Sequence, residues 1–333
     1  MHTIHAQYCD QMFLQDPAVY QHDLTRLSLN MALAGYSSPV FDSNWNVDRE
    51  VGRQTNVNEA FRQLGFLDSP YEPLYTHYDM NLNDSSDKVA FSIAAKDIVN
   101  PEIDYKDDIE RKEHLVAVVL RGGGYGCEWA SNFNVGTRTA ADEHRGFANA
   151  ADDVFATVSR YIRDNFTDGR PVRIWITGYS RSAITSNLTS YRLLNAKESL
   201  GIKALYCYCF ATPAGTKVAD KHLDGIYNFV YDKDLIPRVA FDRWGYSRHG
   251  TTMVISTENV HVTPSQQKRI SETYRQITGG AAEYDPLGYS GIDEEMDMLV
   301  ASLVMIYDTD EEFIIHMQPT LTTLLECLMA NFY

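Results

Sequence analysis

A serine stands between two small residues where a buried strand gives way to a helix. The apolar run at 172–177 predicts the strand, and apolar residues at helical spacing from Ala183 onward predict the helix. The residues between are Gly178-x-Ser180-x-Ser182, nearly the Gly-x-Ser-x-Gly elbow that presents a nucleophilic serine on a sharp turn. The pattern therefore predicts acyl-transfer chemistry at Ser180. The alternative is that Ser180 only caps the helix, since serine is a favoured N-cap residue.

The last position of this elbow is serine where the pattern has glycine. Strand and helix pack closely at such a turn, so Ser182 has two possible effects. Its side chain either pushes the helix from the strand or forms a backbone hydrogen bond that leaves the elbow intact. Ser182→Gly would raise activity in the first case and leave it unchanged in the second.

A glycine-rich loop follows an earlier apolar run, 115–120, which predicts a central parallel strand. Four of the five residues at 122–126 are glycine. A phosphate-binding loop would need the Lys-Ser/Thr pair of the P-loop, which is absent. Hydrolases with a serine elbow take one oxyanion donor from such a loop, so we assign this role to the backbone N–H groups of Gly123 and Arg181. An ordinary tight turn is the alternative.

A serine nucleophile needs a base, usually histidine, which a carboxylate orients. In this class of fold the chain order is serine, acid, histidine. Asp234 follows a predicted strand at 226–231, where open α/β sheets place their sites, and Asp232 is its rival. The candidate bases after it are His249, His261 and His316.

Alternating strands and helices predict a doubly wound, mostly parallel α/β sheet. We expect one domain with a core at about 87–256, a helical N-terminal extension at 1–86 and a helical C-terminal part at 257–333. The expected helices lie at about 17–35, 57–64, 143–166, 264–278, 292–307 and 311–330. The expected strands lie at about 89–93, 115–120, 172–177, 204–210, 226–231 and 253–255.

Composition restricts the partners and the compartment. The net charge of −16 over 333 residues argues against nucleic acid and anionic membrane surfaces, because both require basic patches. No segment has 18 uninterrupted apolar residues, so no membrane span is expected. Five scattered cysteines do not form a disulfide framework and suit a reducing compartment. We expect a cytoplasmic protein, or a secreted one if a signal peptide has been removed.

Neither a metal nor an organic cofactor is expected. Cys207 and Cys209 alternate along a predicted strand and therefore point to the same face. Small buried cysteines account for this pair better than a metal site does.

Six blocks in order resemble the class 3 lipases, the α/β-hydrolase family of neutral lipases and phospholipases A1. They are Val118-Val119-Leu120-Arg121-Gly122-Gly123; Trp129-Ala130-Ser131-Asn132-Phe133, preceded by Glu128 where the family has Asp; His144-Arg145-Gly146-Phe147; the elbow; Phe210-Ala211-Thr212-Pro213-Ala214-Gly215; and the run from Asn228 to Val239 with Gly245 to Gly250. The fifth is similar to the family's Phe-Gly-x-Pro-x-x-Gly. The elbow reads Gly-Tyr-Ser-Arg-Ser-Ala here, where the family has Gly-His-Ser-Leu-Gly-Gly.

The resemblance implies an α/β-hydrolase that cleaves carboxylic esters, acyl lipids in particular, through a Ser-Asp-His triad. The match to Asp-Ile-Val-Pro implies Asp234 as the acid. The family's late histidine implies His316 as the base, with His261 as the next candidate and His249 as a packing residue. Residues 125–134 would correspond to the lid, where aromatic side chains either contact an acyl chain or pack over the glycine loop.

Two other functions stay open on the same residues. An amide or thioester hydrolase would use the same triad, because fold and triad do not separate these reactions. A catalytically inactive hydrolase fold that binds a ligand would also account for the altered elbow.

Overall fold

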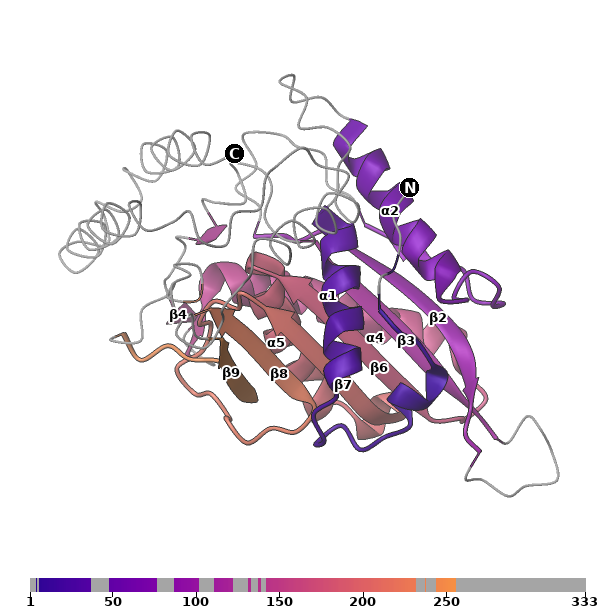
Figure 1. The fold of residues 1–333 in the computed structure, drawn as a ribbon. Coiled ribbons are helices and arrows are strands. Elements are labelled where there is room, and N and C mark those ends of the chain that lie inside the picture. Colours follow the sequence, from indigo (N-terminus) through magenta and orange to yellow (C-terminus); the bar gives the residue numbers. More distant parts are fainter. Residues whose placement is uncertain are drawn as a thin grey trace.

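The computed structural model describes residues 4, 6–36, 48–76, 87–101, 111–121, 131–132, 137–138, 142–231, 237 and 244–255. These residues form a seven-stranded sheet of strand order β1-β2-β3-β6-β7-β8-β9 (Figure 1). The strands are β1 (Leu74–Tyr75), β2 (Phe91–Val99), β3 (Lys112–Leu120), β6 (Val172–Tyr179), β7 (Ile202–Phe210), β8 (Ile226–Tyr231) and β9 (Thr251–Ile255). The pairs β1–β2 and β2–β3 are antiparallel, and the other pairs are parallel. The predicted mostly parallel α/β sheet is confirmed.

Helices cover both faces of the sheet. The crossover helices α4 (Arg145–Asn165) and α5 (Arg181–Asn195) lie behind it in Figure 1, whereas α1 (His22–Tyr36) crosses in front. The helix α2 (Asp48–Gln63) packs beside α1 and contacts β2. The remaining described elements are the 3-10 helices η1 (Asp10–Phe13) and η2 (Glu198–Leu200) and the strand pair β4 (Thr137–Arg138) and β5 (Glu143–His144).

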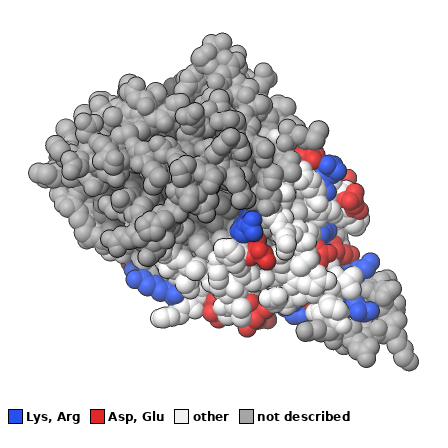
Figure 2. All heavy atoms as spheres, viewed as in Figure 1, with Lys and Arg blue, Asp and Glu red and all other residues white. Residues whose placement is uncertain are grey.

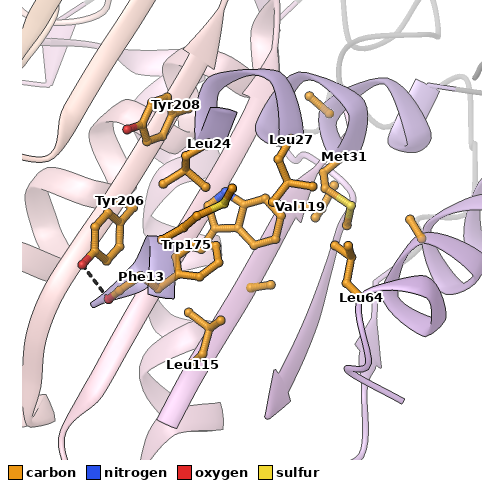
Figure 3. Close-up of a cluster of buried hydrophobic side chains, with 14 of the residues drawn as sticks. Phe13, Leu24, Leu27, Met31, Leu64, Leu115, Val119, Trp175, Tyr206 and Tyr208 are labelled. Atoms are coloured by element: carbon orange, nitrogen blue, oxygen red, sulfur yellow. Dashed lines mark hydrogen bonds between the residues drawn. The ribbon is translucent and has the colours of Figure 1, made fainter. Parts of the chain in front are cut away.

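The core on the α1 face is built around Trp175 of β6. Its ring lies 5.2 Å from that of Phe13, between η1 and the apolar side of α1, which contributes Leu24 and Leu27 (Figure 3). The indole Nε1 donates to Ser28 Oγ at 2.9 Å, so the polar end of the buried ring is satisfied. The N-terminal segment therefore supplies part of the hydrophobic core, while the predicted domain boundaries remain a prediction.

Several predicted boundaries were wrong by a few residues. The first helix begins at His22, the second extends back to Asp48, and the strand predicted at 89–93 continues to Val99. Glu143 and His144, which were expected to start a helix, form β5 instead, and α4 begins at Arg145. The helices predicted after residue 256 lie outside the described residues.

An ion-paired cluster lies at the end of the sheet where β6 begins. Arg170 donates from Nη1 to Asp97 Oδ2 at 3.0 Å and from Nε to Asp168 Oδ2 at 2.8 Å. The buried ring of His114 contacts the same two carboxylates, and Tyr71 donates to Asp97 at 3.0 Å. Burial acts to raise the pKa of both carboxyls, but these hydrogen bonds outweigh it, so each pKa lies below its ordinary value.

This cluster makes stability dependent on acid. A carboxyl with a lowered folded-state pKa stabilises the fold above its unfolded pKa, and the contribution is lost as pH falls through the folded value. We therefore expect the free energy of unfolding to decrease below about pH 4, where aspartate in the unfolded chain takes up protons. Asp97→Asn should lower that free energy by about 1–3 kcal/mol near neutral pH and make the acid dependence shallower.

Urea unfolding at several pH values tests this expectation. Asp164→Asn, a change at an exposed position of α4, is the matched control and should keep the wild-type dependence. An unchanged acid dependence in Asp97→Asn would contradict the assignment.

Candidate active site

Ser180 occupies a strained turn between β6 and α5. Its backbone has φ 59° and ψ −128°, in a region that residues other than glycine rarely adopt. The turn is held on both sides, because the N–H of Ser180 donates to the Phe210 carbonyl at 2.9 Å and its carbonyl accepts from the N–H of Ala183 at 2.9 Å. The half-buried side chain makes no capping hydrogen bond, so the helix-cap alternative does not explain this serine. Strain of this kind at a serine between a strand and a helix is typical of a nucleophile elbow.

The elbow is closely packed at Gly178. A Cβ there would lie 2.6 Å from the carbonyl carbon and oxygen of Ser182, which is why only glycine fits. The Ser182 hydroxyl donates to the Tyr179 carbonyl at 2.8 Å and accepts from the Tyr179 N–H at 2.9 Å. The serine at the position of the family's glycine is thus bound to the backbone of the turn and leaves the turn intact.

This geometry gives an expected result for Ser182→Gly. The variant loses two hydrogen bonds and gains a flexible helical residue, so the free energy of unfolding should fall by about 1–2 kcal/mol without an increase in hydrolysis. Thermal unfolding and an ester assay measure the two effects. Ser186→Gly is the matched control on the same helix, because its buried hydroxyl has no hydrogen-bond partner in the described part of the chain. A rate several-fold above wild type for Ser182→Gly would contradict the geometry.

Arg181 directly follows the serine, and its side chain is buried rather than exposed. Only 1% of the residue is accessible to solvent. The guanidinium donates from Nη1 to Asn132 Oδ1 at 2.9 Å and from Nη2 to the Lys88 carbonyl at 3.4 Å, and it lies 5.7 Å from the centre of the Phe147 ring. The sequence assigned a role only to the backbone of Arg181. The contacts of its side chain are a feature that sequence reasoning missed.

His144 reaches the same asparagine from the start of α4. Its Nε2 donates to the Asn132 carbonyl at 3.1 Å, and its Nδ1 accepts from the N–H of Phe147 at 3.5 Å. The ring stacks on Phe147 with a centroid distance of 4.0 Å. Complete burial, reinforced by the charge of Arg181, lowers the pKa of His144 to about 3. The imidazole is therefore neutral at physiological pH and keeps one tautomer.

Ser131, the residue before Asn132, is also held by hydrogen bonds. Its hydroxyl donates to Asp87 Oδ1, and the other oxygen of this carboxylate accepts from Asn149 Nδ2 at 2.7 Å. A Cβ on Gly146 would lie 2.1 Å from the Ser131 carbonyl, so α4 and this segment are in direct backbone contact. Of the predicted lid at 125–134, the structure describes residues 131–132, and both are buried against the starts of α4 and α5.

The sequence model of the family described as lipase (class 3) matches residues 117–244. Over these 128 of the 333 residues the chain is similar to the class 3 lipases. The matched segment extends from within β3 and contains the elbow, His144 and the turn after β7. Comparison with curated protein sequences finds no match.

Several solved lipases are similar to this chain at low identity. Native Rhizomucor miehei lipase in its propeptide complex is 15% identical, with a TM-score of 0.45 over 72% of this chain and 70% of that chain. A lipase from Rhizopus microsporus var. chinensis is also 15% identical, with a TM-score of 0.41 over 72% and 76%. Lipase II from Rhizopus niveus is 17% identical, with a TM-score of 0.40 over 68% and 78%.

Within the matched segment, Ala211 adopts a second unusual backbone conformation beside the elbow. Its φ is 48°, in the left-handed region that favours glycine, and the family's pattern has glycine at this position. Its N–H donates to the Phe229 carbonyl at 2.8 Å, next to the Phe210 carbonyl that accepts from Ser180. The elbow of this chain is therefore supported by a second strained turn. A departure from the family pattern at Ala211 was the only sequence signal for it.

The other residues assigned from the sequence lie outside the described residues. They are Gly123, Asp232, Asp234, His261 and His316.

His249 is described and is buried. Its ring is parallel to that of Tyr191 at 4.0 Å, and its Nδ1 accepts from the N–H of Asp220 at 3.1 Å. Burial lowers its pKa to about 4. These contacts are those of a packing residue, in agreement with the interpretation from the sequence.

Cys207 and Cys209 are fully buried with their sulfur atoms 3.3 Å apart, on one face of β7 as predicted. Among the described residues, no group of three or more His, Cys, Asp or Glu side chains could bind a metal ion. The described helices are all too short or too polar to cross a bilayer.

Proposed function

We propose that the chain is a serine hydrolase that cleaves carboxylic esters of the acyl-lipid type. The observation that carries the proposal is the strained conformation of Ser180 at the end of β6, with a side chain that makes no capping hydrogen bond. The class 3 lipase match over the segment that contains this turn supports the same chemistry. The finer assignment, a triacylglycerol lipase or phospholipase A1-like enzyme, rests on the family alone.

The proposed reaction has two acyl-transfer steps. The imidazole of His316 takes the Ser180 hydroxyl proton as Oγ bonds to the acyl carbon, and Asp234 orients the imidazole. The tetrahedral intermediate then releases the alcohol, which receives the proton from His316. Water attacks the acyl-serine, gives a proton to the imidazole and releases the fatty acid, and the proton returns to Ser180.

The position of the elbow in the sheet supports the proposed acid and the proposed oxyanion donors. In parallel strands the carboxyl ends meet at one edge of the sheet, and β8 ends at Tyr231, two strands from β6. The chain therefore enters the segment with Asp234 at the edge where Ser180 lies. The backbone N–H of Arg181 begins α5, where the partial positive charge of a helix N-terminus favours an oxyanion. Gly123 is the proposed second donor.

The charge distribution favours neutral over anionic lipid surfaces. The net charge is −16, and acidic and basic side chains are interspersed over the described part of the face in Figure 2. Contact with a lipid surface would then depend on apolar rather than basic groups.

A substrate panel tests the function. Purified protein should hydrolyse p-nitrophenyl esters of butyrate to palmitate and a neutral triacylglycerol emulsion, and it should do so with a metal chelator present. Matched p-nitroanilides and acyl thioesters distinguish the alternatives. Faster turnover of either class would replace the ester assignment with amide or thioester hydrolysis. Binding of acyl esters without turnover would favour an inactive hydrolase fold.

A further inference from the structure

The residue after the proposed nucleophile is a buried arginine in a position where the family's pattern has leucine. Burial of a guanidinium carries a large desolvation cost, and a well-packed apolar residue at such a site is usually as stable or more so. Packing alone therefore does not account for Arg181, which is 1% exposed. The presence of a buried guanidinium at this position requires another explanation.

The contacts of Arg181 join segments that are distant in the sequence. Its two terminal nitrogens donate to Asn132 Oδ1 at 2.9 Å and to the Lys88 carbonyl at 3.4 Å. A guanidinium presents its donors in a rigid planar fork, so two acceptors at different positions fix its orientation. Lysine at the same position would present a compact ammonium group instead.

Asn132 extends this connection to α4. Its side-chain oxygen accepts from Arg181, while its backbone carbonyl accepts from His144 Nε2 at 3.1 Å. The His144 ring is held in turn by the N–H of Phe147 and by stacking on the Phe147 ring. The Arg181 side chain, the side chain and backbone carbonyl of Asn132, and the His144 ring thus form a continuous buried connection from the elbow to the first turn of α4.

We propose that Arg181 is a positioning residue, which holds the turn with Ser180 and its oxyanion donor in register with α4 through Asn132. This inference rests on the proposed function, because the groups it positions are the nucleophile and the backbone N–H of residue 181. A displacement of about 1 Å at reacting groups costs up to roughly 100-fold in rate. Loss of the connection therefore affects kcat more than KM.

Steady-state kinetics with p-nitrophenyl butyrate test the proposal in Arg181→Leu, Arg181→Lys, Asn132→Ala and the double variant Arg181→Leu/Asn132→Ala. Arg181→Leu and Asn132→Ala should each lower kcat by about 10- to 100-fold with KM nearly unchanged. The double variant should be no slower than the slower single variant, because the two substitutions remove the same connection. Arg181→Lys should recover only part of kcat. Arg160→Leu, at an exposed position of α4, is the matched control and should keep the wild-type rate.

Thermal unfolding of each variant distinguishes a loss of folding from a displacement of the turn with Ser180. If Arg181→Leu does not fold, the proposal is tested with Asn132→Ala and Arg181→Lys. Independent, multiplying losses in the double variant would overturn the proposal. So would full activity in Arg181→Lys together with full activity in Asn132→Ala, since charge alone would then suffice. Wild-type rates in all Arg181 variants, with Ser180→Ala inactive, would overturn this role and leave the function standing. An inactive wild-type protein would overturn both.

Discussion

Ser180→Ala is expected to lower the rate of p-nitrophenyl butyrate hydrolysis by about 10⁴- to 10⁶-fold. The loss is this large because the members of a catalytic triad act as a unit, and only binding and the oxyanion donors remain. The structure adds a reason to expect that this variant keeps the fold of the wild-type protein. The Ser180 side chain makes no capping hydrogen bond, so removal of Oγ leaves the turn and its backbone contacts in place.

The matched control for this variant is Ser190→Ala on the same helix. The Ser190 hydroxyl is buried and has no hydrogen-bond partner in the part of the chain that the structure describes. Its removal should change neither the rate nor the melting temperature appreciably. Equal rates for wild type and Ser180→Ala would refute the assignment of Ser180 as the nucleophile.

The second large effect is expected at the base. His316→Ala should lower the rate by about 10⁴-fold or more, because an unactivated serine hydroxyl is a weak nucleophile. His261→Ala should leave most of the activity, because His261 takes no part in proton transfer if His316 is the base. The exposed His222→Ala is the neutral control. The measurement is the kcat of each variant on the same soluble ester.

Two results would change the assignment of the base. A loss confined to His261→Ala would transfer the role to His261. Full activity in both variants would exclude these two candidates and leave His249, although its Nδ1 is occupied by the N–H of Asp220.

The regular elements near the elbow were predictable because each depends on local sequence. The strand β6 and the helix α5 follow from apolar periodicity, and the turn between them follows from its small residues. Gly178 is required by a backbone contact with Ser182 that the elbow pattern already implies. The class of fold could thus be inferred before any coordinates, and Ser180 could be proposed as the nucleophile.

Elements with polar residues on buried positions were not predictable in the same way. The strand β2 continues past Ile93 through Lys96, whose Nζ donates to the Leu64 carbonyl at 2.9 Å. Lys96 also pairs with Asp10 at 2.8 Å, so the partners that permit its burial are far away in the sequence. A local pattern contains no information about such partners, and the predicted strand therefore ended too early.

The connection from Arg181 through Asn132 to His144 was hidden for a related reason. The three residues are separated by at least a dozen positions and meet only in the folded chain. The sequence indicated that Arg181 departs from the family's leucine, but it did not indicate where the side chain lies. Likewise, only the coordinates show that the Ser182 hydroxyl bonds to the backbone of Tyr179.

The most direct test of Ser180 as an activated nucleophile is covalent labelling with a fluorophosphonate, followed by tryptic peptide mapping. Cleavage after Arg173 and Arg181 yields the peptide Ile174–Arg181, in which Ser180 is the single serine. We predict that the phosphonate mass is found on Ser180 in this peptide and that labelling and loss of ester hydrolysis proceed in parallel. An enzyme that loses activity with the label on another residue, or that stays active with Ser180 fully labelled, would contradict the account.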